Sequence, residues 1–362
     1  MKKTKILLVT GGTGGHIIPA VSLYEEAKKR GYEVCLSVDR RFLQFRQYFS
    51  DNLNYHVVAS DKLSGSIFRK MIGVFKLILG FLQSIKLILI EKPSIVIGFG
   101  GYTTFATLLA AKFLRKPVLV HEQNSVMGNA NYTLSDGLAD LVLTAFPDVK
   151  NIHPKAKTKY IGNFVRKEIR ESATELPDLK KNGEVVVTIL GGSQGASILS
   201  EVVPKALAEF SKESKFKLQV FHQAREEDIE RVRRVYVQNE IKCEVEKFFN
   251  DVNQKISKSH LIICRSGAST IFDLTFLGRA PILIPIPYSY KNHQLLNAQF
   301  IEKNKAGWII EQKDFTSKKL AERLDEIFAD FNALKTYSRN MLDLKKDGFD
   351  SIFTIIKNYC AN

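Results

Sequence analysis

The hydrophobic positions of this chain fall into short apolar runs, each followed by a turn of small or polar residues. The first run is Lys5 to Thr10, and Gly11-Gly12-Thr13-Gly14-Gly15-His16 follows it before a helical pattern from Pro19 to about Lys29. Uninterrupted apolar runs of this length are typical of buried parallel strands whose faces are covered by helices. Further strands are predicted at 32–38, 55–59, 94–98, 117–120, 140–145 and 159–162.

A second series of strands follows a polar segment, 171–183, that contains Pro177 and that we interpret as a linker region. Its strands are predicted at 184–190, 217–221, 243–248, 261–264, 281–286 and 307–310. The tail from Leu320 to Tyr359 has a helical pattern, and we expect its last part to return to the first domain. At 362 residues the chain is long for one core, so the two series predict two doubly wound α/β domains.

Turns rich in glycine or small residues follow several predicted strands and open the helices after them. Besides the first turn, these are Gly98-Phe99-Gly100-Gly101-Tyr102, Gly191-Gly192-Ser193-Gln194-Gly195 and Ser266-Gly267-Ala268-Ser269-Thr270. A helix start offers unpaired N–H groups and a partial positive charge, both of which favour a phosphate. An ordinary βαβ unit gives the same local pattern. The glycine spacing differs from the dinucleotide fingerprint, but Asp39 lies near its acidic position, so a dinucleotide-binding oxidoreductase stays a minority interpretation.

Polar residues near these turns supply candidate chemistry. His16 lies in a glycine turn at the end of a strand, where an imidazole that titrates near neutrality suits a general base. Asp273 falls one turn into the helix after Ser266, where a carboxylate can accept hydrogen bonds from a sugar hydroxyl. His293 and Gln294 lie in a polar loop after the next strand. We interpret these features as one face of a nucleotide-sugar site.

The charge of the chain is strongly positive and unevenly distributed. The formal net charge is +15, and residues 1–163 carry 22 basic against 11 acidic side chains. A basic N-terminal half indicates an anionic partner, such as lipid headgroups, a pyrophosphate or nucleic acid. The chain has no RNA-binding signature and no basic stripe interleaved with aromatic residues, so nucleic acid ranks below lipid.

Residues 66–89 combine helical spacing of apolar side chains with lysines and an arginine. This pattern predicts an interfacial helix on an anionic lipid surface, with Phe68, Ile72 and Phe75 as membrane contacts. The alternative is a helix packed on the sheet with lysines at its rim, which is equally acceptable for Leu77 to Leu89. Because no stretch of about 18 residues is apolar and uncharged, we expect no membrane-spanning segment.

The remaining composition limits the chemistry further. The four cysteines never form a C-x-x-C pair, which indicates free thiols in a reducing compartment and no zinc site. The apolar run at the start is too short for a signal peptide. No D-x-D triplet occurs, so we predict neither a metal nor another cofactor.

Five ordered blocks of this chain resemble the MurG family of peripheral membrane glycosyltransferases. The blocks are Gly11 to His16, Gly100-Gly101-Tyr102, His121-Glu122-Gln123-Asn124 with Gly128 and Asn131, Gly191 to Ala196, and Cys264 to Ala268. The resemblance implies a GT-B fold, in which two Rossmann-like doubly wound parallel-sheet domains face a cleft. It also implies transfer of N-acetylglucosamine from UDP-GlcNAc to lipid I, undecaprenyl-pyrophosphoryl-MurNAc-pentapeptide, at the cytoplasmic face of the cell membrane, in cell-wall synthesis and alongside other cell-wall enzymes.

The resemblance also implies roles for individual residues. The expected donor contacts in the second domain are Ser193, Phe249, Ala268, Ser269, Thr270, Ile271, Phe272, Asp273, His293 and Gln294, and those from the first are Thr13, Gly14, Gly15, Asn124 and Arg166. The expected acceptor-pyrophosphate contacts are Gly100, Gly101 and Tyr102. Three positions differ from the family's usual sequence. Asp273 stands where the family usually has Glu, Phe164 replaces a usual Pro, and Thr103 to Ala106 replace a run of smaller residues. The predicted division is 1–163 with about 340–362 for acceptor and membrane, and 164–339 for UDP-GlcNAc.

We therefore predict an inverting transfer in which the C4 hydroxyl of MurNAc attacks the anomeric carbon as UDP leaves. His16 is the predicted base, with Glu122 behind it as a second catalytic candidate. A helix cap is the alternative role for Glu122, and a surface salt bridge for Arg166. Two other functions stay open: a UDP-GlcNAc 2-epimerase of similar architecture, and a non-catalytic membrane subunit that binds a sugar nucleotide.

Overall fold

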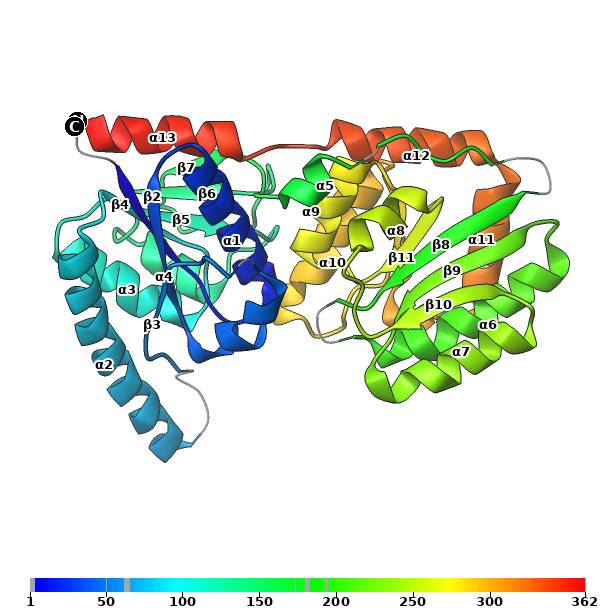
Figure 1. Ribbon diagram of the computed structural model, residues 1–362, viewed down its shortest axis with the longest axis horizontal. Helices are drawn as coiled ribbons and strands as arrows, with labels where there is room; N and C mark the ends of the chain where they lie inside the picture. The colour runs from blue at the N-terminus through cyan, green and yellow to red at the C-terminus, as the bar shows by residue number, and fades with distance from the viewer. Residues whose placement is uncertain are drawn as a thin grey trace. The chain divides into compact units, whose positions relative to one another are not determined.

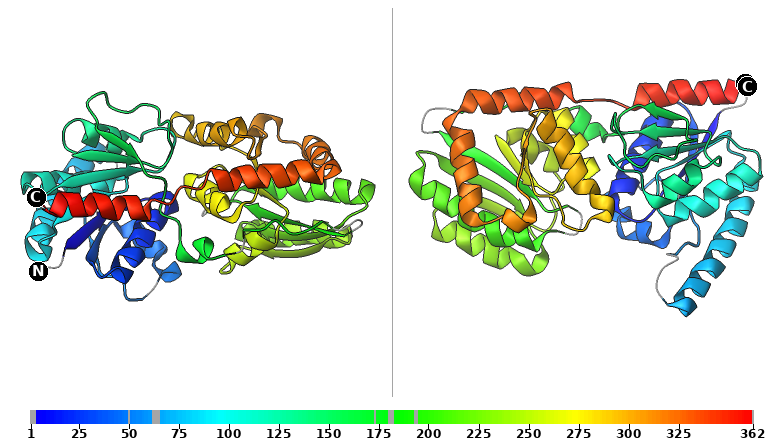
Figure 2. Two further views of the ribbon diagram at one scale, coloured as in Figure 1. Left: turned by 90° about the horizontal axis from the view of Figure 1, so that it is seen from above. Right: turned by 180° about the vertical axis from the view of Figure 1, so that it is seen from behind.

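The computed structural model describes residues 4–49, 51–61, 66–172, 174–179, 183–192 and 195–361 (Figures 1 and 2). The chain divides into two compact units. The N-terminal unit comprises Met1–Arg166 with Lys346–Asn362, and the C-terminal unit comprises Lys167–Lys345. The sequence-based division, at 163/164 and about 340, assigned a separate function to each domain. That assignment stays a prediction.

The N-terminal unit is built on a parallel sheet of seven strands in the order β3-β2-β1-β4-β5-β6-β7. The strands are β1 Lys5–Val9, β2 Glu33–Val38, β3 Tyr55–Val57, β4 Ile95–Gly98, β5 Val118–Glu122, β6 Leu141–Thr144 and β7 Thr158–Tyr160. The helices are α1 Gly14–Lys29, α2 Ile67–Glu91, α3 Tyr102–Phe113, α4 Asn129–Ser135 and α13 Phe349–Ala361, with short 3-10 helices η1 Arg40–Gln44 and η2 Arg46–Tyr48. This strand order is that of a doubly wound Rossmann-like sheet.

Alternating residues of β1 show how the two faces of this sheet are covered. Ile6 and Leu8 pack in a buried cluster that includes side chains of α1 and α13. Leu7 and Val9 pack on the opposite face, in a cluster that includes side chains of α2 and α3. Because both faces are buried, the strand is apolar throughout, as its sequence predicts.

The C-terminal unit repeats this arrangement with six parallel strands in the order β10-β9-β8-β11-β12-β13. The strands are β8 Glu184–Leu190, β9 Lys217–Gln223, β10 Lys242–Glu246, β11 Leu261–Cys264, β12 Pro281–Leu283 and β13 Trp308–Ile309. The helices are α5 Lys167–Arg170, α6 Ser197–Glu213, α7 Ile229–Gln238, α8 Val252–Lys258, α9 Ala268–Leu277, α10 His293–Lys303, α11 Ser317–Ala329 and α12 Phe331–Asp343, with 3-10 helices η3 Glu226–Asp228, η4 Tyr290–Asn292 and η5 Gln312–Asp314. The predicted fold class, two doubly wound α/β domains, is confirmed.

A fully buried arginine holds together part of the C-terminal unit. Arg279 donates to the carbonyl oxygens of Leu277 and Ser257, each at 2.6 Å, and of Glu175 at 2.7 Å. Two of these carbonyls lie in the last turns of α9 and α8, where helix carbonyls lack intrahelical partners and carry partial negative charge. The guanidinium therefore satisfies helix ends and fixes the segment that enters the unit.

The ends of two helical segments differ from the sequence-based expectation. Helix α1 begins at Gly14, not at Pro19, so the glycine turn forms the first helical turn. The helical tail is divided into α11, α12 and α13. Asp330 divides the first two, because its side chain accepts a hydrogen bond from Ala333 N at 3.0 Å and caps α12.

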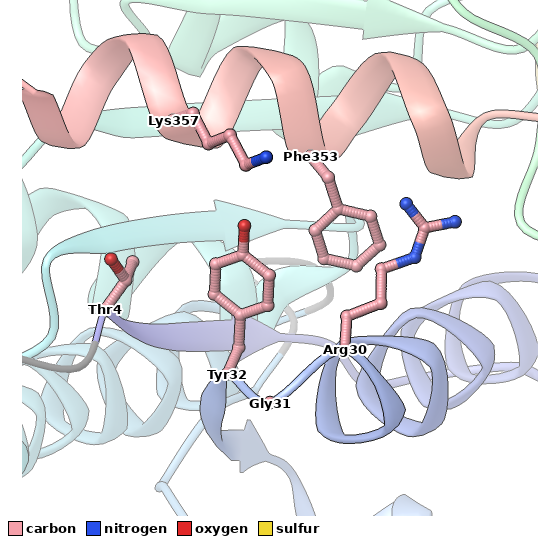
Figure 3. Close-up of a pocket in the computed structure, with 6 residues that line it drawn as sticks. All are labelled: Thr4, Arg30, Gly31, Tyr32, Phe353 and Lys357. Carbon is pink, nitrogen blue, oxygen red and sulfur yellow. The ribbon is translucent and has the colours of Figure 1, made fainter.

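Helix α13 packs on the N-terminal unit beside the end of α1 (Figure 3). The rings of Tyr32 and Phe353 stack with centroids 5.2 Å apart, and the Arg30 guanidinium lies 4.5 Å from the Phe353 centroid. Arg30 also donates to Asp350 at 2.9 Å. Figure 3 shows Arg30 and Tyr32 facing Phe353 and Lys357 across a shallow hollow of about 280 Å³.

Helix α2 resembles a membrane span in length and composition, while the expectation that no segment spans a membrane stays a prediction. Residues Met71–Glu91 are long and apolar enough to cross a membrane by length and composition, since two lysines do not offset the apolar side chains. The same helix is docked on the N-terminal unit along one face. Ser84 is buried and its hydroxyl lies 2.9 Å from that of Thr107 in α3, while Gln83 accepts a hydrogen bond from Ala59 N at 2.8 Å.

The opposite face of α2 is apolar and exposed. The predicted membrane contacts lie on it, with Phe68 exposed by 71%, Phe75 by 68% and Ile72 by 38%. Met71 and Val74 are exposed among them, and the surface continues through Ile78, Leu79 and Leu82, within the stretch for which core packing was an equal alternative. In Figures 1 and 2 the N-terminal half of α2 extends away from the sheet of its own unit. The membrane role of these residues stays a prediction.

We predict that Gly80→Ala destabilises the protein although alanine is the better helix former. A Cβ at Gly80 would lie 2.1 Å from the carbonyl oxygen of Ala59, so α2 must move away from its docking segment. We expect a loss of about 1–3 kcal/mol in the free energy of unfolding, measured in urea, against a propensity gain of about 1 kcal/mol. Leu79→Ala, at a half-exposed neighbour, is the control and should cost less. A Gly80→Ala protein more stable than wild type would contradict this docking.

Candidate functional site

The sequence-predicted residues of the N-terminal unit gather at the carboxyl ends of three neighbouring strands. Strand β1 pairs with β4, and β4 pairs with β5. The loops after them are therefore adjacent, because the carboxyl ends of parallel strands meet at one edge of a sheet. We call residues 10–16, 99–101 and 121–131 the N-terminal cluster.

Two glycines allow the first two loops of this cluster to touch. A Cβ at Gly101 would lie 3.1 Å from the Gly11 carbonyl oxygen, and one at Gly100 would lie 3.1 Å from His16 Nε2. Both glycines have φ near +90°, which side-chain-bearing residues rarely adopt. The predicted base His16 is thus half-buried between the glycine turns. Tyr102 begins α3, and its side chain lies outside the described part of the structure.

The first turn of α1 presents backbone N–H groups at this edge. Its N-cap, Thr13, is exposed and makes no side-chain cap, and no acidic residue lies in the first turn. The N–H groups at Gly14 and Gly15 therefore have no intrahelical acceptor and are available to an anion. These positions are the ones that the family resemblance assigns to substrate contacts.

Glu122 is the centre of a hydrogen-bond network. Its carboxylate is 2% exposed and accepts from Asn124 N at 3.1 Å, Gly128 N at 3.0 Å and Asn131 Nδ2 at 2.8 Å. Burial raises the pKa of Glu122, although these hydrogen bonds oppose the shift. Gly128 is the N-cap residue of α4, so the contacts support the alternative of a helix cap. The catalytic assignment of Glu122 stays a prediction.

His121 is also fully buried and serves the same network. Its Nε2 lies 3.0 Å from the Gly162 carbonyl oxygen, and its Nδ1 lies 3.2 Å from Gln123 Nε2. Burial lowers the pKa of His121 to about 4, so the imidazole is neutral near pH 7. Sequence reasoning did not identify this structural role, because a histidine at a strand end resembles a catalytic one.

The second group of predicted residues lies at the equivalent edge of the C-terminal unit. Strands β8, β11 and β12 are adjacent, and the loops after them bring together residues 191–192, 195–196, 265–273 and 284–294. We call these residues the C-terminal cluster. Ser193 lies outside the described residues. Arg166 is half-buried at the end of the N-terminal unit.

Side-chain hydrogen bonds lock the turn before α9. The Ser266 hydroxyl donates to the Gln294 carbonyl oxygen at 2.8 Å, Asn297 Nδ2 donates to the Ser266 carbonyl oxygen at 3.2 Å, and Gln294 Oε1 accepts from Ile286 N at 3.1 Å. Gln294 is thus a positioning residue here. Ser266 and Asn297 have no role predicted from the sequence, since their partners lie about 30 residues away.

The start of α9 has the features of an anion site. Gly267 is its N-cap and makes no side-chain cap, and no acidic residue lies in the first turn. The Ser269 hydroxyl oxygen is buried and lacks a hydrogen-bond partner among the described residues. Ala268, Ile271 and Phe272 are buried, while Thr270 is half-buried. Ile271 N donates to the Gly267 carbonyl oxygen at 3.0 Å, so backbone N–H groups for a ligand come from the residues before it. Asp273 follows one turn later and is 8% exposed.

Two other predicted donor contacts differ in accessibility. His293 begins α10, and its Nδ1 lies 2.9 Å from the Tyr290 carbonyl oxygen; burial lowers the pKa of this imidazole. The Phe249 ring is 4% exposed and lies under Lys255, whose Nζ is 4.9 Å from the ring centroid. A ligand would therefore meet the backbone at Phe249 and not its ring.

Comparisons with known proteins agree along nearly the whole chain. Models of the glycosyltransferase family 28 N-terminal and C-terminal domains match residues 6–141 and 186–352. A Rickettsia canadensis protein named UDP-N-acetylglucosamine–N-acetylmuramyl-(pentapeptide) pyrophosphoryl-undecaprenol N-acetylglucosamine transferase is 36% identical, over 98% of this chain and 99% of its own. A Rickettsia africae protein of the same name is 35% identical with the same coverage.

Solved structures show the same fold. The crystal structure of MurG from Acinetobacter baumannii covers 98% of this chain and 99% of its own, with a TM-score of 0.79 and 25% identity. A Listeria monocytogenes protein described as a UDP-N-acetylglucosamine 2-epimerase covers 99% of this chain and 96% of its own, with a TM-score of 0.69. At 14% identity that likeness shows the fold alone.

The buried His121 predicts a pH dependence of stability. Its pKa is about 4 when folded against an ordinary 6.5, so between these values the unfolded chain takes up a proton that the folded protein does not. Stability should therefore fall as the pH is lowered from 7 to 5, by about 2 kcal/mol from this group. His121→Gln should lose that part of the pH dependence in urea unfolding.

The control for this measurement is Phe164→Leu. Phe164 packs on His121 with ring centroids 4.8 Å apart, so the substitution disturbs the same core without removing a titratable group. It should lower stability at pH 7 and keep the wild-type pH dependence. Equal pH dependence in His121→Gln and wild type would show that His121 is protonated in the folded protein above pH 5.

Proposed function

The chain belongs to the MurG family within glycosyltransferase family 28, and we propose that it transfers N-acetylglucosamine from UDP-GlcNAc to lipid I, giving lipid II for peptidoglycan synthesis. The observation that carries the proposal is the full-length match, at 36% identity, to a relative named for this reaction. The two helix starts without a side-chain cap agree with it, because both substrates carry a diphosphate.

The donor binds to the C-terminal cluster in this proposal. The N–H groups at Ala268 and Ser269 receive the diphosphate of UDP-GlcNAc, and the buried Ser269 hydroxyl gains a partner. The partial positive charge of the helix start stabilises the charge that develops on the leaving UDP. Asp273 accepts hydrogen bonds from the ribose, although it is one methylene shorter than the family's usual Glu.

The acceptor binds to the N-terminal cluster. The N–H groups at Gly14 and Gly15, which the resemblance implies as donor contacts, receive its diphosphate in this proposal, and Gly100 and Gly101 let the second turn pack against the first. Asn124 is oriented by Glu122, which accepts from its backbone N and its Nδ2, and it is a substrate contact in this proposal. Both carboxylate oxygens of Glu122 accept hydrogen bonds from protein N–H groups. In this scheme Glu122 therefore positions Asn124 and α4.

The reaction proceeds by a single displacement. The C4 hydroxyl oxygen of MurNAc forms a bond to the anomeric carbon of GlcNAc, and the bond from that carbon to the UDP phosphate oxygen breaks with its electron pair. The hydroxyl proton passes to the His16 imidazole, which contributes about a hundredfold or more as a general base. Attack on the face opposite UDP inverts the configuration and gives a β-1,4 bond.

The exposed apolar face of α2 supports peripheral association with the membrane that holds lipid I. Docking through Ser84 and Gly80 fixes one face of α2 on the protein, which leaves the other face for lipid. Arg69 and Lys86 are exposed on the same helix, where they suit anionic headgroups at the cytoplasmic surface.

The first test is transfer itself. Purified protein with UDP-GlcNAc and a lipid I analogue should release UDP and form lipid II in equal amounts. His16→Ala should lower turnover by about a hundredfold or more with unchanged affinity for UDP-GlcNAc. His56→Ala, on the edge strand β3 beside Glu91, is the matched control and should keep full turnover.

Four outcomes would overturn these assignments. UDP release without a glycosylated lipid product would remove the transferase proposal. Conversion of UDP-GlcNAc to its C2 epimer would favour the 2-epimerase alternative. Full turnover in His16→Ala would remove His16 as the base, and binding of UDP-GlcNAc without any turnover would favour a non-catalytic subunit.

The second test concerns the membrane. Combined substitution of Phe68, Ile72 and Phe75 by Ser should weaken binding to phosphatidylglycerol vesicles by about tenfold or more, because three exposed apolar side chains leave the lipid. Val237→Ser, which removes a side chain that is 64% exposed on α7, should not change binding. Wild-type binding by the triple variant would show that these side chains do not contact lipid.

A further inference from the structure

An arginine that the family resemblance did not single out lies over the first glycine turn. Arg41 belongs to η1, directly after strand β2. A Cβ placed on Gly12 would lie 3.7 Å from Arg41 Nη2 and 3.8 Å from both Cζ and Nη1. The guanidinium thus faces Gly12 across a space that a single Cβ would bring into van der Waals contact, and the Arg41 side chain is 41% exposed.

A buried carboxylate holds this guanidinium in place. Asp39 is 3% exposed, and its Oδ2 accepts from Arg41 Nε at 2.7 Å and also from Nη2. Its Oδ1 accepts from Arg41 N at 3.1 Å and from Gly12 N at 3.4 Å. One carboxylate therefore fixes both the glycine turn and the cation beside it.

Two N–H groups of Arg41 remain available to a ligand. Arg41 Nη1 makes no hydrogen bond to any residue that the structure describes. A guanidinium presents its donors in a rigid fork, so the edge not used by Asp39 can bind a second anion. Asp39 leaves the cation oriented without enclosing it, since the Arg41 side chain is 41% exposed.

We propose that Arg41 is a binding residue for the diphosphate of the acceptor at the N-terminal cluster. This inference rests on the proposed function, which supplies the diphosphate. The turn offers N–H groups at Gly14 and Gly15 without an acidic residue in the first turn of α1, and Arg41 adds the formal positive charge that these backbone groups lack. Charge-assisted hydrogen bonds to phosphate are stronger than those from neutral amides.

The hydrogen bonds that the Asp39 carboxylate accepts also argue against the minority interpretation of a dinucleotide site. A ribose-binding acid must keep its oxygens available to sugar hydroxyls. Here Asp39 accepts from Gly12 N, Arg41 N, Phe42 N and the guanidinium. These contacts indicate that Asp39 holds the glycine turn and Arg41 in place.

The test is equilibrium binding of inorganic pyrophosphate by calorimetry, with UDP in excess to occupy the C-terminal cluster, together with kinetics on a lipid I analogue. Arg41→Met should weaken pyrophosphate binding, and lower kcat/KM for the lipid, by about 10- to 100-fold. The KM for UDP-GlcNAc should not change. Arg40→Met, the exposed neighbour on the same 3-10 helix, is the matched control and should behave as wild type.

A second variant separates binding from folding. Arg41→Met leaves the buried Asp39 without its cation, so the paired change Asp39→Asn with Arg41→Met restores neutrality and keeps an oxygen for the Gly12, residue 41 and Phe42 N–H groups. This double variant should regain thermal stability and stay defective for pyrophosphate. Recovery of pyrophosphate binding would overturn the proposal.

Other outcomes are equally decisive. Equal pyrophosphate affinity in Arg41→Met and Arg40→Met, or a raised KM for UDP-GlcNAc in place of the lipid effect, would also overturn it. If wild type makes no lipid II but Arg41→Met still loses pyrophosphate, the proposed function fails while anion binding by Arg41 stands.

Discussion

The contact between two glycine turns at the carboxyl edge of the N-terminal sheet sets the geometry of its candidate site. Neighbouring strands β1 and β4 bring the turns together, and Gly100 and Gly101 let them touch because neither has a Cβ. His16 lies in the space that this leaves. A side chain at Gly100 would displace the imidazole, and one at Gly101 would press on the Gly11 carbonyl. Parallel pairing therefore produces the site only in combination with these glycines.

The C-terminal unit reaches a similar result with different residues. Its turn before α9 is fixed by hydrogen bonds among Ser266, Gln294 and Asn297. These bonds use the side chains and leave the first N–H groups of α9 unpaired, as the glycine turn does at α1. Each sheet has such a helix start at its carboxyl edge, after β1 in one and, in the other, after β11, the neighbour of β8 that is equivalent to β4. The proposed reaction joins two diphosphate-bearing substrates, and each of these helix starts suits one diphosphate.

Much of this architecture could be predicted from sequence, because buried parallel strands are apolar on both faces and end in small-residue turns. That pattern located the strands, the glycine turns, and His16 and Asp273 beside them. Hydrogen bonds and contacts between side chains that are far apart in the sequence leave no such pattern. Arg41 follows a strand like many surface arginines, and only the folded chain places it over Gly12. The sequence did not identify α2 as apolar enough for a membrane span, because two lysines interrupt its apolar stretch. Which of its side chains are exposed depends on its packing against α3.

The hydrogen bonds also distinguish the two predicted catalytic residues. A general base needs a lone pair directed at the substrate hydroxyl. Both carboxylate oxygens of Glu122 already accept N–H groups, Oε1 from Asn124 and Oε2 from Gly128 and Asn131. Proton uptake there would weaken the bonds that hold α4 and Asn124. His16 instead sits where two backbone turns meet, on the helix start to which we assign the acceptor diphosphate. A protonated imidazole at that position would gain from the nearby diphosphate, which makes proton uptake by His16 more favourable as substrate binds.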